Sequence, residues 1–200
     1  MATALLWECD TRDLVSFAES LRAMGWNLLA SAGTAKYLNE QGIPARDITE
    51  LVEPPILDHD ALAICKILAA LSANNSPEDQ AKLAKIRMPR IDLVYVNIDP
   101  LLLVGEAGNL SCTRESVIEK INIVGPTLLR AAAKGRRFVL CDRTQISEIL
   151  DYLMERLQSP EPPDEHDDRF ALRLAWRAER IVARYCHLSA NLLYRLADDS

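Results

Sequence analysis

Short apolar runs alternate with amphipathic segments along most of the chain, and this alternation constrains the fold more than any other feature of the sequence. The apolar runs are typical of buried strands, whereas the segments between them carry apolar residues at helical spacing. Strands that alternate with helices form parallel sheets covered on both faces. The sequence therefore predicts a three-layer α/β/α fold with a mainly parallel central sheet. We predict strands at 2–7, 26–30, 43–48, 91–98 and 138–141, and helices at 13–24, 35–41, 57–71, 77–85, 125–134 and 145–157.

The C-terminal part of the chain has a different composition. Residues 159–168 are rich in proline and acidic side chains, which is typical of a solvated linker. Residues 169–196 have the periodicity of one long amphipathic helix or of two. We therefore predict a domain at 1–158, a linker at 159–168 and a helical segment at 169–200 that packs on the same domain. The acidic residues around His166 could also hold a cation, but the neighbouring prolines favour a linker.

Charge and cysteine usage exclude several classes of protein. The net charge of -6 and the scattered basic residues argue against nucleic acid as a partner. The five cysteines form no C-x-x-C pair and the three histidines have no zinc-like spacing, so we predict no metal site and reduced thiols. The sequence has no signal-peptide pattern and no apolar stretch of about 20 residues. We expect a cytoplasmic protein with no membrane contact.

Ligands of an open parallel sheet bind where strands end and helices begin. Four turns are predicted at that edge: 9–11, 31–34, 97–100 and 122–125. The turn Ser31-Ala32-Gly33-Thr34, with Lys36 close by, would favour a phosphate or carboxylate, although the same residues also suit a plain helix cap. Lys134 ends a predicted helix, so its ammonium could either complement the helix dipole or reach the cleft.

Four segments together resemble one family in order and spacing. They are ASAGTAKYL, PPILD, IDLVYVNIDPL and INIVGPTLLRAAAK, the last of which contains Asn122 and ends at Lys134. They resemble IMP cyclohydrolase, the N-terminal half of the bifunctional purine-biosynthesis enzyme, and the C-terminal FALRLAWRAERIVARY is also similar to that family. The resemblance implies a methylglyoxal-synthase-like fold, ring closure with loss of water, a small-molecule substrate, no cofactor and a homodimer.

The resemblance also assigns residues to a substrate site. The family's phosphate turn is retained except that Ala32 replaces a glycine, and the family's asparagine and helix lysine are present as Asn97 and Lys134. The residues that the resemblance places at the substrate are Cys9, Asp10, Thr11, Ser31, Ala32, Gly33, Thr34, Lys36, Asn97 and Gly125, and Lys66 could also reach the site from the segment that departs from the family.

The departures from the family fall at its catalytic positions. Asp99 stands where the family has tyrosine, Asn122 where it has aspartate, and Thr11 where it has a lysine. The segment that carries another catalytic lysine is replaced, and that lysine aligns with Ala61 or Leu62. Lys134 is therefore the one main catalytic group that is kept.

This combination of retained and replaced family residues leaves three hypotheses about function. The first is a repurposed cyclase of specialised metabolism, in which Asp99, Asn122 and Lys134 act on a formamido, amide or carbonyl substrate. The second is a non-catalytic module that senses a phosphorylated metabolite. The third is a true IMP cyclohydrolase in which Lys66 compensates for a lost lysine. Methylglyoxal synthase chemistry fits less well because the histidine- and aspartate-rich site is lacking, and Cys9 has no nearby histidine to activate it as a nucleophile.

Overall fold

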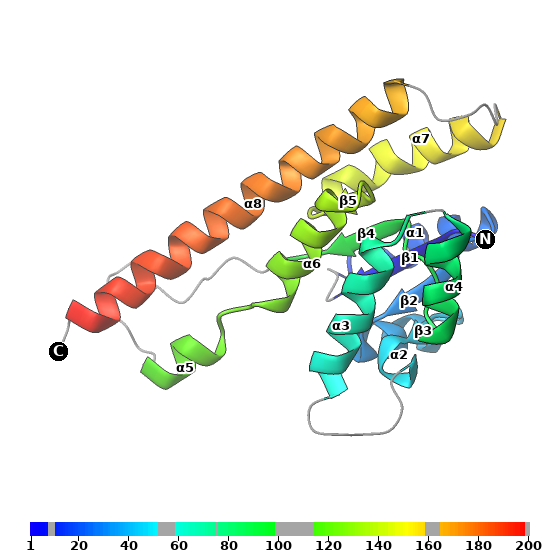
Figure 1. The fold of residues 1–200 in the computed structure, drawn as a ribbon. Helices are drawn as coiled ribbons and strands as arrows, with labels where there is room; N and C mark the ends of the chain where they lie inside the picture. The colour runs from blue at the N-terminus through cyan, green and yellow to red at the C-terminus, as the bar shows by residue number, and fades with distance from the viewer. Residues whose placement is uncertain (8–10, 52–58, 75, 99–113, 159–164, 199–200) are drawn as a thin grey trace.

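A parallel sheet forms the centre of the computed structural model, which describes residues 1–7, 11–51, 59–74, 76–98, 114–158 and 165–198. Its strands are β1 (Thr3–Trp7), β2 (Asn27–Ala30), β3 (Arg46–Asp47), β4 (Leu93–Val96) and β5 (Phe138–Leu140). They lie in the order β3-β2-β1-β4-β5, and every described pairing is parallel (Figure 1). The predicted α/β class and mainly parallel sheet are confirmed.

The central strands β1 and β4 are buried along their whole length, which is why their sequences TALLW and LVYV read as continuous apolar runs. The edge strand β3 is shorter than the predicted 43–48. Ile48 begins the 3-10 helix η1 (Ile48–Leu51), and the Asp47 side chain accepts from the Thr49 N–H at 2.9 Å. This local turn takes the backbone out of the ladder after two residues.

Helices cover both faces of the sheet. They are α1 (Leu14–Ala23), α2 (Ala32–Glu40), α3 (His59–Ser72), α4 (Pro77–Lys85), α5 (Arg114–Glu119), α6 (Val124–Lys134), α7 (Ile146–Gln158) and α8 (Glu165–Asp198). The chain moves outward from β1 to β3 and then returns through β4 to β5, so right-handed crossovers place α1 and α2 on one face and α3 and α6 on the other. Contacts between α1 and α7, and between α3 and α6, agree with these two layers.

The C-terminal segment is one helix, α8, rather than two. Its buried side chains recur every three or four residues from Phe170 to Tyr185 and pack over α6 and β5 (Figure 1). The helix begins at Glu165, inside the predicted linker, because its acidic first turn suits the positive end of the helix dipole and Arg169 pairs with Glu165 at 2.6 Å. None of the described helices is long and apolar enough to cross a membrane.

At the end of the sheet where the strands begin, Arg137 connects the start of β5 to α3. The side chain is buried, and its guanidinium donates to the Leu71 carbonyl at 3.0 Å and to the carbonyl of Ala73. These bonds satisfy carbonyls at the C-terminal end of α3 that have no partner within the helix. Burial lowers the pKa of Arg137 from its ordinary value, and nearby Arg90 acts in the same direction. The end of α3 packs so closely on the end of α6 that a side chain at Gly135 would clash with the Leu71 backbone.

Replacing Gly135 with alanine should destabilise the protein. The added Cβ would lie 2.2 Å from the Leu71 carbonyl oxygen, so the backbone of α3 or α6 must move. We expect Gly135→Ala to lower the free energy of unfolding by about 1–3 kcal/mol in urea titrations, as overpacking does. Gly33→Ala is the matched control, since nothing lies within 4 Å of a Cβ there and alanine favours the helix. Equal stability of the two variants would contradict the predicted clash.

Candidate functional site

Residues from the carboxyl ends of β4 and β5 meet α8 around a cavity of about 410 Å³, which we term the edge cleft. Its walls are Arg12 before α1, Asn97 and Ile98 after β4, Cys141, Asp142 and Arg143 after β5, and Ile181, Arg184, Tyr185 and Leu188 on α8. Its position, at the end of the sheet where parallel strands give way to helix N-termini, is where such folds bind ligands.

A second cavity, of about 660 Å³, adjoins the edge cleft and lies between the start of α7 and α8. We term it the arginine cleft. It shares Cys141, Asp142, Ile181 and Arg184 with the edge cleft, and its other walls are Thr144, Gln145, Glu148, Arg177, Arg180 and Ala183. The two cavities therefore meet along these four shared residues.

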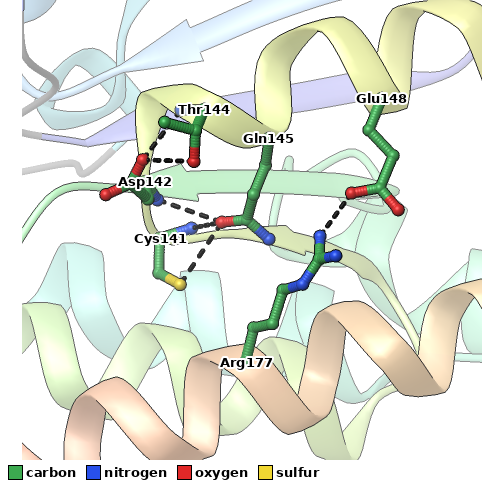
Figure 2. Close-up of polar contacts among 6 residues, drawn as sticks. All are labelled: Cys141, Asp142, Thr144, Gln145, Glu148 and Arg177. Carbon is green, nitrogen blue, oxygen red and sulfur yellow. Dashed lines mark hydrogen bonds and ion pairs between the residues drawn. The ribbon is translucent and has the colours of Figure 1, made fainter.

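A capping box holds the loop between the two clefts in place. It lies in the 3-10 helix η2 (Arg143–Gln145), whose N-cap residue is Asp142. The Asp142 carboxylate accepts from the N–H of Thr144 at 2.8 Å and from its hydroxyl at 2.7 Å (Figure 2). In return, the Gln145 side-chain oxygen accepts from the N–H groups of Cys141 at 2.9 Å and of Asp142 at 3.0 Å. Reciprocal bonds of this kind fix the start of a helix.

Among the described residues that line the two clefts, cationic groups outnumber anionic ones. The cleft linings contain five arginines, at 12, 143, 177, 180 and 184, against the carboxylates of Asp142 and Glu148. Arg143 pairs with Asp13 at 3.2 Å, Arg177 pairs with Glu148, and the Arg180 guanidinium lies 4.6 Å from the centre of the Trp176 ring. Among the described residues, Arg184 has no hydrogen-bond or ion-pair partner. The clefts therefore favour an anionic ligand.

The thiol of Cys141 borders both clefts but is not activated. Burial raises its pKa to about 11, and the Asp142 carboxylate acts in the same direction. Its sulfur donates to the Gln145 side-chain oxygen at 3.4 Å. A cysteine nucleophile must be a thiolate. The structure therefore gives Cys141 a structural role near neutral pH.

Among the described residues, Asn97 is the predicted site residue that lines the edge cleft, and Asn122 lies close by. The Asn122 side-chain oxygen accepts from the Gly125 N–H at 2.8 Å, and the Asn122 backbone N–H donates to the Tyr185 hydroxyl at 2.6 Å. A Cβ on Gly125 would be 3.3 Å from the Ile98 side chain, so the start of α6 approaches the end of β4 closely. Asn122 thus caps α6 beside the cleft, and Tyr185 connects that cap to α8.

The predicted phosphate turn lies at the start of α2 and does not line either cleft. Ala32, Gly33 and Thr34 form the first turn of that helix rather than a turn before it, and the Ser31 hydroxyl donates to the Thr34 hydroxyl at 3.0 Å. Ala32, Gly33 and Lys36 are exposed. A helix start of this kind still presents backbone N–H groups to an anion. Its binding role stays a prediction.

Lys134 and Lys66 lie away from the edge cleft. Lys134 is exposed at the C-terminal end of α6, and twelve residues separate it from Asn122, which corresponds to about 18 Å along a helix. The Lys66 ammonium donates to the Leu51 carbonyl. Thr11 is exposed before α1, whereas Cys9, Asp10 and Asp99 lie outside the described residues. The structure therefore does not bring Lys134 and Asn97 together within one copy of the chain.

Sequence reasoning missed the residues that dominate the two clefts. Two signals were present. Arg177, Arg180 and Arg184 recur at i, i+3 and i+7 beside the apolar stripe of α8, which predicts one cationic face. Asp142 and Gln145 have the spacing of a capping box directly after a strand. Neither signal shows that the two features face each other across a cavity.

Comparison with known proteins identifies the family of this chain. The model of the MGS-like domain matches residues 13–127. The chain belongs to the MGS-like domain family. It is 32% identical over 200 residues to the bifunctional purine biosynthesis protein PurH of Polynucleobacter necessarius subsp. necessarius (strain STIR1), and the match covers 98% of this chain and 37% of PurH. The solved structure "Crystal structure of ForH" is also similar, with a TM-score of 0.75 and 27% identity, covering 96% of this chain and 98% of ForH.

These similarities confirm the resemblance that the sequence motifs indicated. This MGS-like chain is a diverged relative of IMP cyclohydrolase, and the family relationship holds for its fold as well as for its sequence. The chain spans little more than a third of the length of PurH, so the activity of the whole PurH protein does not transfer directly.

Cys141 of this MGS-like domain should resist alkylation. With a pKa of about 11, the thiol stays neutral at pH 7.5, so its thiolate fraction is about 100-fold below that of an ordinary cysteine. We expect peptide mapping after iodoacetamide treatment to show rapid labelling of the exposed Cys65 and Cys186 and at least 100-fold slower labelling of Cys141. The urea-unfolded chain is the control, in which all three should react alike. Comparable rates in the folded protein would contradict the raised pKa.

Proposed function

We propose that the chain is a cyclohydrolase-like enzyme that closes a ring on a formamido, amide or carbonyl substrate with loss of water. We further propose that it has been repurposed from purine synthesis to specialised metabolism. The relation to PurH over 98% of the chain supports the reaction class. The observation that carries the proposal is the edge cleft, which presents the Asn97 amide and several arginines at the carboxyl end of β4.

The proposed reaction sets clear demands on the cleft. An amide nitrogen attacks the formyl or carbonyl carbon, a C–N bond forms, and the nitrogen proton passes to the developing oxyanion to give a carbinolamine. The C–O bond then breaks as the C–N bond becomes a C=N double bond, and hydroxide leaves as water with the second proton of the same nitrogen. Such a step requires a hydrogen-bond donor at the oxyanion and a group that carries protons.

Asn97 is the donor that this proposal places at the oxyanion. It follows β4 directly, lines the cleft and has no side-chain partner among the described residues. We assign proton transfer to Asp99, two residues further along the chain. Cationic walls would also stabilise negative charge that develops during the reaction.

Asn122 acts in this proposal through the position of α6. Its side chain caps the helix and keeps Gly125 against Ile98, so the floor of the cleft depends on it. Lys134 remains the proposed electrostatic stabiliser on the basis of the family resemblance alone, because its ammonium lies at the far end of α6.

The second candidate function is a sensor module that binds a phosphorylated metabolite without converting it. The cationic clefts favour it, since they would bind an anion whether or not chemistry follows. A true IMP cyclohydrolase is less well supported. The residue that would compensate, Lys66, has its ammonium bound to the Leu51 carbonyl.

We also propose a cytoplasmic homodimer that acts on a small molecule and binds no nucleic acid. The outward side of α8 supports self-association, because Leu172, Trp176 and Tyr194 are each more than half exposed there. Sedimentation of Trp176→Glu against the native chain tests this surface. A dimer that survives the substitution would show that another surface is used.

Turnover assays distinguish the candidates. We expect the purified protein to convert the family's formamido nucleotide or a related formamido amide, followed by ultraviolet absorbance. Asn97→Ala and Asp99→Ala should lower kcat by about 100-fold, as loss of an oxyanion donor or a proton carrier does. Asn191→Ala is the control, because this exposed asparagine of α8 lies outside both clefts.

Two results would overturn the cyclase proposal. One is turnover that survives loss of both Asn97 and Asp99. The other is no turnover of any formamido substrate together with a rise in melting temperature when a phosphorylated ligand is added, which would favour the sensor module.

A further inference from the structure

The side-chain amide of Gln145 is held in one orientation. The residue is 3% exposed, and its oxygen accepts from two backbone N–H groups and from the Cys141 sulfur (Figure 2). A flipped amide would place its NH2 group against two N–H donors, which cannot accept hydrogen bonds. The nitrogen therefore occupies the opposite side of the amide from the Cys141 and Asp142 backbone.

That nitrogen belongs to a residue that lines the arginine cleft, and it has no hydrogen-bond partner among the described residues. The atom is nevertheless fully buried. Figure 2 shows the nitrogen turned toward the side on which the Arg177 guanidinium lies. Buried polar groups are nearly always hydrogen-bonded, so a donor left over at a cavity wall indicates an acceptor from outside the chain.

The other charged side chains of this wall leave few hydrogen-bond acceptors free for a ligand. Arg177 is held by Glu148, and Arg184 projects from α8 with no partner among the described residues. The Asp142 carboxylate accepts from Thr144, and the Glu148 carboxylate accepts from Arg177. Both acids are thus engaged by donors, so a cation would find little free negative charge, whereas an anion would meet several donors.

We propose that Gln145, Arg177 and Arg184 form a binding site for an oxyanion group, a carboxylate or a phosphate, of a small organic ligand. The Gln145 amide and the two guanidinium groups donate to its oxygens, and the cavity of about 660 Å³ accommodates the rest of the molecule. The site stands apart from the phosphate turn at Ser31–Thr34 and does not depend on the proposed cyclase activity.

Titration with simple oxyanions tests this site. Inorganic phosphate, pyrophosphate, succinate and citrate are added to the full chain at constant ionic strength, and binding is followed by calorimetry and by melting temperature. We expect saturable binding of at least one of them. The two phosphates and the two carboxylates distinguish which oxyanion source the site prefers.

The decisive variant is Gln145→Glu. A glutamate oxygen can still accept from Cys141 and Asp142, so the capping box is preserved, but the second oxygen replaces a donor with a negative charge. We expect binding to weaken at least 100-fold while the melting temperature of the unliganded protein does not fall. Arg184→Gln should weaken binding by about 10- to 100-fold, as loss of a charged hydrogen bond does.

Arg195→Gln controls for the loss of one charge from the same helix. Arg195 is exposed near the end of α8 and lines neither cleft, so this variant should bind as the native chain does. Retained binding in Gln145→Glu would overturn the proposal, and so would equal losses in Arg184→Gln and Arg195→Gln, which would indicate unspecific attraction. Failure of the native chain to bind any of the four anions would overturn it as well. Because turnover is not measured, none of these outcomes by itself supports or overturns the cyclase proposal.

Discussion

The side chains that α8 buries form one stripe, and that stripe packs on α6 and β5, the elements beside the carboxyl edge of the sheet. This packing sets where the other face of α8 points. Arg177, Arg180 and Arg184 lie beside the stripe and consequently face the loop after β5. The Tyr185 hydroxyl then accepts from the Asn122 N–H, so the same helix also holds the start of α6. Both clefts exist because one amphipathic helix lies across the last strand of a parallel sheet.

The loop after β5 shows how a structural motif can also provide a binding group. A capping box needs only the oxygen of a glutamine side chain, and it uses the Gln145 oxygen fully. Because an amide has two ends, satisfying the oxygen leaves the nitrogen turned toward the side of Arg177, which also lines the cavity. The cap therefore positions a donor with an accuracy that a flexible surface side chain would not have. The raised pKa of Cys141 has the same origin, since the loop that fixes the amide also removes the thiol from water.

Much of the fold could be predicted from the sequence, because buried parallel strands leave long apolar runs such as IDLVYVNI and helices leave periodic ones. The limits of β3 and α8 were less predictable. Ile48 is apolar in either conformation, and the acidic residues 165–168 suit a linker as well as a helix start. Asn97 was predictable as a cleft residue because it begins the predicted turn 97–100 and matches the family's asparagine. The role of Gln145 was not, since it depends on a helix that begins twenty residues later in the sequence. Lys134 shows a third limit. The family motif predicts that Lys134 ends a helix, but only the structure shows that the length of α6 separates its ammonium from the edge cleft.

The position of α8 in the chain also has a consequence for biosynthesis. All the described strands of the sheet are present once β5 has been made, but the clefts need side chains as far along as Leu188. Chains are synthesised from the N-terminus, and a domain generally folds as a unit. A nascent chain that ends before α8 can therefore contain every strand and still lack the walls that contact a ligand. The proposed ligand sites would therefore be completed only after α8 has been made, later than the sheet.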